Sequence, residues 1–186
     1  MNYKKSYKKL LHSLEDSKVS GDKIIETIND IKTLFDNTTD FDTALNKTLE
    51  NLSKLTNAGR AYVFMLRKNN KVIDNTHEYC QQGVMPQIDY LQGLPIELIP
   101  WWMEKLHNKE LIHIKDVSKL PLEAINEKET LENQQIKSLL SFPIFSNNNK
   151  LIAFIGLDNV QEVSEWEEHN IHLLKTISFI IADHLK

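Results

Sequence analysis

Two pairs of closely linked β-rich segments are the feature that most constrains the fold of this chain. The first pair, "RAYVFMLRKNNKVIDNTHEYC", turns at residues 68–71, and the second, "IKSLLSFPIFSNNNKLIAFIGLDNV", turns at residues 146–149. Strands joined by so short a connection pair antiparallel. The strands do not alternate regularly with helices, so a parallel sheet is not expected. The pattern predicts an α+β fold with a central antiparallel sheet of about five strands, "LIHI" (111–114) being the fifth, and helices on both faces.

Helical periodicity appears before, between and after these strands. In the first such segment Ile24, Ile28 and Ile31 recur at spacings of four and three, which places them on one helix face. The second has Asp40 as an N-cap and ends at 57–59, "NAG". The last opens at Ser164 with the spacing of a capping box. The predicted helices cover residues 22–35, 40–59, 100–108 and 120–135, with the last running from 164 to the C-terminus.

Composition excludes several classes of protein. The chain has 186 residues, of which 41% are hydrophobic and 26% charged, as in an ordinary globular domain. A net charge of −4 gives no support for nucleic-acid binding. No apolar run is long enough to span a membrane and no signal-peptide pattern begins the chain, so we expect a cytoplasmic protein. Residues 1–20 are lysine-rich and are interpreted as a basic tail or helical extension before a domain at 21–186.

Few residues suggest catalysis or metal binding. The chain has no glycine-rich phosphate loop, no HExxH motif and no cysteine pair. Cys80 is the single cysteine, and His77 points to the opposite face of the same predicted strand, so an inert thiol is expected. His113 is either a structural histidine or a donor to an anionic ligand. Asp116 follows a strand, where a turn or cap residue is the usual role. The seven histidines lack metal-ligand spacing.

The aromatic residues give the best indication of a binding site. Trp101 and Trp102 follow Pro100, which suits the first position of a helix. Trp102 shares a face with Leu106, four residues on, and is predicted to anchor the core, which leaves Trp101 at the edge of a pocket. In the first strand, Tyr62 and Phe64 share one face and Val63 and Met65 the other, and the sequence leaves open which pair lines the pocket.

Over residues 40–184 the sequence resembles a GAF domain of the type that accompanies histidine kinases and diguanylate cyclases. The resemblance rests on the order and spacing of "GRAYVFML", "EYCQQGVMPQID", "PWWMEKLHNKELIHIKDVSKLP", "LENQQIKSLLSFPIF" and "KLIAFIGLDNV". It implies a sensory module that regulates an effector domain in cis or in trans. It also implies a small-molecule pocket beneath the short helices and loops between strands two and four, and a parallel homodimer through the first and last helices.

These considerations define two sets of candidate residues. The candidate pocket residues are Trp101, Tyr62, Phe64, His113, Asp116 and Ser138. In the last helix, apolar residues spread over about half of the circumference, wider than one sheet contact needs. Either the sheet takes one side and a partner helix the other, or the helix has a single broad core face with Phe179 exposed. The candidate dimer residues are Ile24, Ile28, Ile31, Leu174, Ile181 and Leu185.

The ligand itself is not identified by the sequence. We expect no required cofactor, and neither haem nor a bilin, because Cys80 is not in an obvious bilin-attachment motif. Two alternatives remain. One is an enzyme similar to the free-methionine-sulfoxide reductases, a group that uses several cysteines where this chain has one. The other is a dimerisation module that binds no ligand.

Overall fold

The two predicted hairpins form and lie at the centre of one sheet in the computed structural model, which describes residues 3–15 and 21–185. Neighbouring strands are antiparallel, in the order β3-β2-β1-β6-β5-β4. The strands are β1 (Arg60–Arg67), β2 (Val72–Cys80), β3 (Leu94–Pro95), β4 (Ile112–Ile114), β5 (Ser138–Phe145) and β6 (Leu151–Asn159). The helices are α1 (Tyr3–Glu15), α2 (Gly21–Asn37), α3 (Phe41–Thr56), α4 (Pro100–His107), α5 (Ile125–Asn133) and α6 (Glu168–His184). The predicted α+β class is confirmed.

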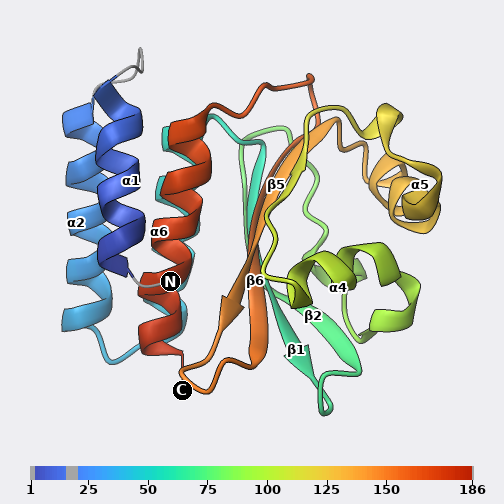
Figure 1. The fold of residues 1–186 in the computed structure, drawn as a ribbon, viewed down its shortest axis with the longest axis horizontal. Coiled ribbons are helices and arrows are strands. Elements are labelled where there is room, and N and C mark those ends of the chain that lie inside the picture. The colour runs from blue at the N-terminus through green and yellow to red at the C-terminus, as the bar shows by residue number, and fades with distance from the viewer. Residues whose placement is uncertain (1–2, 16–20, 186) are drawn as a thin grey trace.

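The helices cover both faces of the sheet unequally (Figure 1). On one face α3 and α6 lie against the strands, and α1 and α2 form a further layer outside them. On the other face, among the described residues, the sheet is covered by the short helices α4 and α5 together with loops and 3₁₀ turns. This thinner cover is where the pocket expected from the GAF resemblance would lie.

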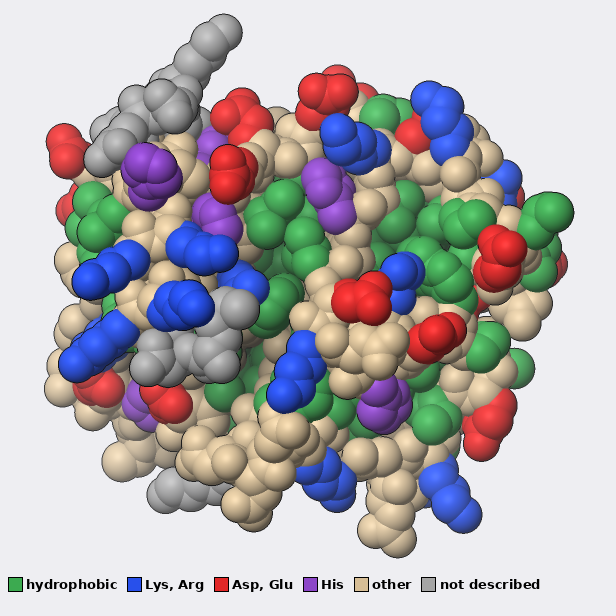
Figure 2. Space-filling view, viewed as in Figure 1, with side chains coloured by type: hydrophobic (Ala, Val, Ile, Leu, Met, Phe, Trp, Pro, Cys, Tyr) green, Lys and Arg blue, Asp and Glu red, His purple; other side chains and the backbone are tan. Residues whose placement is uncertain are grey.

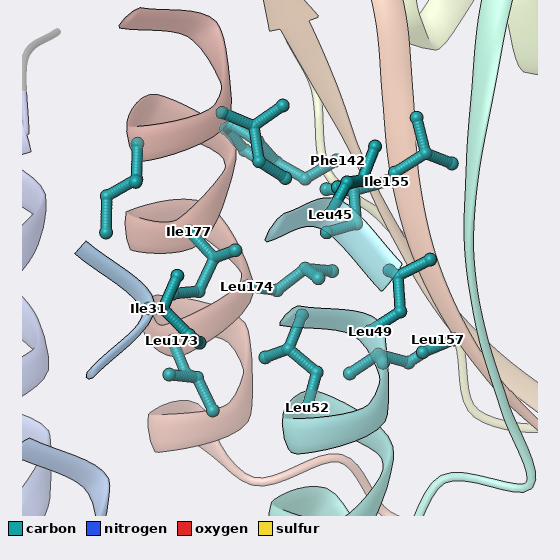
Figure 3. Packing of buried hydrophobic residues seen from close by; sticks show 14 of the residues in the cluster. Ile31, Leu45, Leu49, Leu52, Phe142, Ile155, Leu157, Leu173, Leu174 and Ile177 are labelled. Carbon is teal, nitrogen blue, oxygen red and sulfur yellow. The ribbon is translucent and has the colours of Figure 1, made fainter. Parts of the chain in front are cut away.

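The alternation of side chains along β1 supplies two separate cores. Ala61, Val63 and Met65 point to the face covered by α3 and α6, whereas Tyr62 and Phe64 belong to the core beneath α4 and α5. The first core is mostly aliphatic. Leucines of α3 and α6 meet over β6 there, as Figure 3 shows for Leu45, Leu49, Leu52, Leu173, Leu174, Ile155 and Leu157.

Several local predictions are confirmed. The Asp40 side chain accepts hydrogen bonds from the backbone N–H groups of Asp42 and Thr43 at the start of α3, and Asn57 ends that helix in the left-handed conformation. Pro100 is the first residue of α4, with Trp102 and Leu106 buried on one face. These features depend on contacts between residues close in sequence, which is why sequence patterns revealed them.

Other boundaries differ from the predictions. The sheet has six strands because β3, only two residues long, pairs with the start of β2. The segment after Pro121 begins with a 3₁₀ turn at Leu122–Ala124 before α5. The last helix begins at Glu168 rather than Ser164, since Glu167 and Asn170 form the capping box. In the predicted capping box the Glu167 side chain would have accepted a hydrogen bond from the backbone N–H of Ser164. In the structure the Asn170 side chain accepts one from the backbone N–H of Glu167 instead.

The terminal helices pack within the chain. The N-terminal segment forms the helical extension, α1, whose Leu10 is fully buried and whose Ser6 hydroxyl lies 3.2 Å from that of Thr176 in α6. The candidate dimer residues of α2 and α6 are at most 1% exposed, apart from the half-buried Leu185. Apart from Leu185, the candidate dimer residues are therefore not at the surface of a single chain, because α1 and α2 pack against the wide apolar face of α6. Dimerisation itself stays a prediction.

The surface over α1 is basic. Lys4, Lys5, Lys8 and Lys9 are exposed, and Figure 2 shows cationic side chains gathered on this side of the molecule. Among the described residues, no helix combines the length and apolar character that crossing a membrane would require.

Gly156 is required by the close approach of β6 to the Tyr62 ring. These two residues are paired opposite each other, and a Cβ added at Gly156 would overlap the ring. We expect Gly156→Ala to lower the free energy of unfolding by about 1–3 kcal/mol, because a packed ring must move. Urea denaturation measures this cost. In the double variant with Tyr62→Leu the cost of the alanine should shrink, and strictly additive effects would contradict the explanation.

Candidate functional site

A cavity of about 70 Å³ lies between the sheet and the cover formed by α4 and α5. Four aromatic rings form much of its wall: Tyr62 and Phe64 from β1, Phe154 from β6 and Trp102 from α4. The Phe64 and Phe154 rings stack with centroids 4.9 Å apart, and the Tyr62 ring meets Phe64 edge-on at 5.6 Å. These are favourable arrangements of aromatic pairs, so the wall is rigid and flat-sided.

Polar side chains enter this aromatic cavity from three elements. They come from β2, β6 and α5. The polar lining residues are Asn75, Glu78, Glu127, Thr130, Gln134 and Asp158. The remaining apolar lining residues are Ile73, Leu91, Leu94, Ile99, Leu131 and Ile136. Apolar walls with a few convergent polar groups are the usual composition of a small-molecule site.

A buried ion pair closes one end of the cavity. Arg60 and Asp158 are each 2% exposed at their side chains, and Arg60 Nε donates to Asp158 Oδ1 at 3.0 Å. The guanidinium also donates to the backbone oxygens of Met85 and Gln134, at 3.4 and 3.0 Å. Burial raises the pKa of Asp158 to about 6, although the adjacent Arg60 opposes that rise.

Glu78 and Asn75 organise the β2 wall. One carboxylate oxygen of Glu78 accepts hydrogen bonds from the backbone N–H groups of Gln87 and Ile88, at 2.8 and 3.1 Å. The other accepts from Asn75 Nδ2 at 3.1 Å. Glu78 therefore anchors the loop after β2 and holds the Asn75 amide in place.

Glu127 joins the two helices of the cover. It comes from the first turn of α5, is 2% exposed, and accepts a hydrogen bond through Oε1 from the backbone N–H of Trp102 at 3.2 Å. That N–H belongs to the first turn of α4, whose cap residue Ile99 offers no side-chain acceptor. A carboxylate in this position also interacts favourably with the helix dipole.

The predicted pocket residues are only partly brought together. Tyr62 and Phe64 line the cavity, which identifies the pocket-facing side of β1. Trp102 lines it as well as packing in the core, whereas Trp101 lies on the flank, with Lys105 Nζ 4.9 Å above its ring. Trp102 is in the core, as predicted, and it also lines the cavity because the cavity lies within that core, whereas Trp101 is not among the lining residues.

The other three predicted residues lie outside the cavity lining. Ile112 and Ile114 belong to the core beneath α4 and α5, so His113, between them on β4, points to the other face. Asp116 caps a 3₁₀ turn by accepting from Ser118. Ser138 is fully buried and accepts from the backbone N–H of Ser164 at 3.0 Å. The position of His113 follows from the alternation of side chains along a strand, and that of Asp116 from its role in a turn.

The sequence reading missed the buried polar residues of the cavity. Glu127 carried a usable signal, since it stands between Ala124 and Leu131 at helical spacing, in a position where an apolar residue is expected. Asn75 and Asp158 gave a weaker signal, because each is a polar residue inside a β-rich segment. Which of them converge depends on strand pairing.

Cys80 does not have the environment of a nucleophile. It is partly buried at the end of β2 and is not among the cavity-lining residues. Burial, followed by the nearby Glu78, raises the pKa of its thiol to about 12. Because the thiolate is the reactive form, this environment argues against the reductase alternative.

A larger hollow of about 750 Å³ lies beside α1, α6 and β5. Its cations are Lys4, Lys109 and Lys175, of which the last two lie over the rings of Phe145 and Phe142. None of its lining residues has a buried, unpartnered polar side-chain atom among those described. The smaller cavity is therefore the better candidate site.

Comparisons with known proteins agree with this fold. The GAF domain family model matches residues 40–185. No curated protein matches the chain. The phycocyanobilin-bound GAF domain of a cyanobacterial phytochrome is similar in structure, with a TM-score of 0.74, 16% identity, and 90% of this chain and 94% of that one covered.

Two further solved structures are similar. The phycoerythrobilin-bound GAF domain of a cyanobacterial phytochrome has a TM-score of 0.75 and 17% identity, with 90% of this chain and 95% of that one covered. The chromophore-binding domain of Stigmatella aurantiaca phytochrome P1 has a TM-score of 0.72 and 14% identity, with 91% and 62% covered. The expectation that excluded a bilin is corrected by these structures, because domains of this fold hold bilins.

The buried ion pair predicts a pH dependence of stability. Because the pKa of Asp158 is raised in the folded state, this carboxyl's stabilising contribution is complete below pH about 4 and is lost as pH rises through about 6. Side-chain ¹³C NMR should find the titration near 6. Arg60→Met should move it higher and lower the free energy of unfolding at pH 8 by about 3–5 kcal/mol, since an unpaired buried charge remains. A wild-type titration near the ordinary value of 3.8 would contradict this account.

Proposed function

The chain belongs to the GAF domain family, and we propose that it is a sensory module that binds a small molecule in the cavity beneath α4 and α5. The observation that carries this proposal is the convergence of buried polar side chains, Asn75, Glu127 and Asp158, on a cavity with aromatic walls. Purely structural cores rarely bury such groups, because each must find a hydrogen-bond partner.

We further propose that ligand binding is transmitted to an output domain through the terminal helices. The cavity floor is formed by β1 and β6, whose opposite faces pack against α3 and α6. A ligand that shifts these strands biases the packing of α6 and of α1 alongside it. The sequence resemblance favours a histidine kinase or a diguanylate cyclase as the output.

A cavity-blocking variant tests the site. Compounds from a metabolite library that raise the melting temperature of the wild type should have no effect on Leu91→Trp, because Leu91 lines the cavity and is half-buried at its edge. Leu98→Trp is the matched control, since Leu98 is 56% exposed and is not among the lining residues. Differential scanning fluorimetry provides the measurement.

Two results would count against the site. If the same compounds still stabilise Leu91→Trp, they bind elsewhere on the molecule. If neither a library of broad chemistry nor native mass spectrometry of the purified protein finds any ligand, the dimerisation-module alternative is favoured over the sensor.

A bilin is the second candidate ligand, because similar solved structures hold one. The aromatic walls suit pyrrole rings, and the buried carboxylates can accept hydrogen bonds from pyrrole N–H groups. Two features fit less well. The described lining residues include no lysine, arginine or histidine to bind propionates, and the cavity is smaller than the ~300–1,000 Å³ typical of ligand sites. Binding a tetrapyrrole would therefore require α4 and α5 to move away from the sheet.

Visible absorbance tests this candidate directly. The protein would be incubated with phycocyanobilin or biliverdin and passed through a desalting column. If the site accepts a bilin, absorbance should elute with the wild type and decrease strongly for Leu91→Trp but not for Leu98→Trp. Equal retention by both variants would indicate non-specific adsorption and would reject the candidate. Retention by Cys80→Ala after denaturation would exclude attachment through that thiol.

A further inference from the structure

Three polar atoms at the cavity have no hydrogen-bond partner among the described residues. They are Glu127 Oε2, Asn75 Oδ1 and Trp102 Nε1. All three residues line the cavity and are 2%, 1% and 6% exposed, respectively. Buried polar atoms are nearly always paired, so unpartnered atoms in a cavity indicate where another molecule donates or accepts.

Both carboxylate oxygens of Glu127 lie in a defined environment. Oε1 accepts from the Trp102 backbone N–H, which fixes the side chain, and Oε2 is the unpartnered oxygen. Asn75 is similarly fixed. Its Nδ2 donates to Glu78 Oε1 at 3.1 Å, its backbone N–H donates to Leu91 O at 2.8 Å, and its backbone oxygen accepts from Gln92 Nε2 at 2.7 Å. Two acceptor oxygens are therefore held in place with no donor of the described residues bonded to them.

The charge around the cavity has the same sign as these acceptors. Glu78, Glu127 and Asp158 are acidic lining residues, and the described lining includes no basic residue. Arg60, whose partner Asp158 lines the cavity, is already paired with that carboxylate. Glu78 is held by backbone N–H groups and the Asn75 amide, and no ion pair is formed by Glu127 among the described residues. A buried carboxylate without a cation favours a positively charged ligand and disfavours an anion.

The walls restrict the shape of the ligand. The stacked rings of Phe64 and Phe154, with Tyr62 edge-on, form flat apolar surfaces suited to a planar group. Aromatic faces also attract cations. The flat aromatic walls favour a planar ligand, and the two free acceptor oxygens favour a ligand that carries N–H donors.

We infer that the cavity recognises a small planar cation, an aromatic molecule with a protonated nitrogen or amidinium group that donates to Glu127 Oε2 and Asn75 Oδ1. This inference rests on the proposed function and specifies the chemistry of its ligand. It also assigns Glu127 as a specificity-determining residue that binds the charge of the ligand while its other oxygen caps α4.

Three isosteric probes of different charge test the inference: benzamidine, benzamide and benzoate. At equal ionic strength, calorimetric titration should detect benzamidine binding to the wild type, weaker binding of neutral benzamide and no binding of benzoate. Glu127→Gln keeps the shape and the α4 cap but removes the charge, so benzamidine affinity should fall about ten- to hundredfold. Glu129→Gln is the matched control, because Glu129 is exposed on the same helix.

A measurement on the wild type keeps the test valid if Glu127→Gln fails to fold. In a ¹³C NMR titration with benzamidine, the Glu127 carboxyl resonance should shift while that of Glu129 stays constant.

The outcomes separate this inference from the proposed function. Benzoate binding as tight as benzamidine, with Leu91→Trp abolishing it, would overturn the ligand class but leave the cavity as a binding site. Benzamidine binding that survives Glu127→Gln unchanged would remove the role assigned to that carboxylate. If none of the three probes binds, the inference is overturned, while the proposed function stands or falls on the library experiment.

Discussion

The pairing of β1 with β6 at the centre of the sheet is the interaction on which the rest of the structure depends. It sets Arg60 opposite Asp158 and Tyr62 opposite Gly156. The Arg60 guanidinium reaches from this pair to Met85 in the loop after β2 and to Gln134 at the end of α5. One side chain thereby connects the central strands to the loop after β2 and to the end of α5. Because the pair is buried, loss of either partner would leave an uncompensated charge in the core.

The two faces of the sheet use this scaffold differently. The face under α3 and α6 is filled mainly by aliphatic side chains, with a few aromatic ones such as Phe142 (Figure 3). The face under α4 and α5 places aromatic rings beside carboxylates and an amide. Close packing favours rigidity on the first face. On the second face the unpaired polar atoms can form hydrogen bonds with a ligand, and these bonds would contribute to the free energy of binding. Glu127 has two roles, since one carboxylate oxygen accepts a hydrogen bond from the start of α4 and the side chain also lines the cavity.

How much could be predicted depended on the range of the contacts involved. The Asp40 cap, the Asn57 stop and the Pro100 start were predicted because each involves residues a few positions apart. β3 was missed because two residues in a loop leave no periodic signal, and its pairing with β2 spans the intervening loop. The wide apolar face of α6 was real, but the sequence could not distinguish a partner chain from α1, whose Ser6 meets Thr176 across 170 positions.

The sequence by itself determined the two hairpins, the helix order, the Trp102 and Leu106 face, and a resemblance specific enough to name a family. It could do so because hydrophobic period and turn chemistry are local properties. Only the tertiary structure decided that Tyr62 and Phe64 face the cavity, that Trp101 does not line it, and that Asn75, Glu78, Glu127 and Asp158 converge. Convergence of residues from β2, β6 and α5 follows from strand register and from packing between distant segments, and no local pattern encodes either.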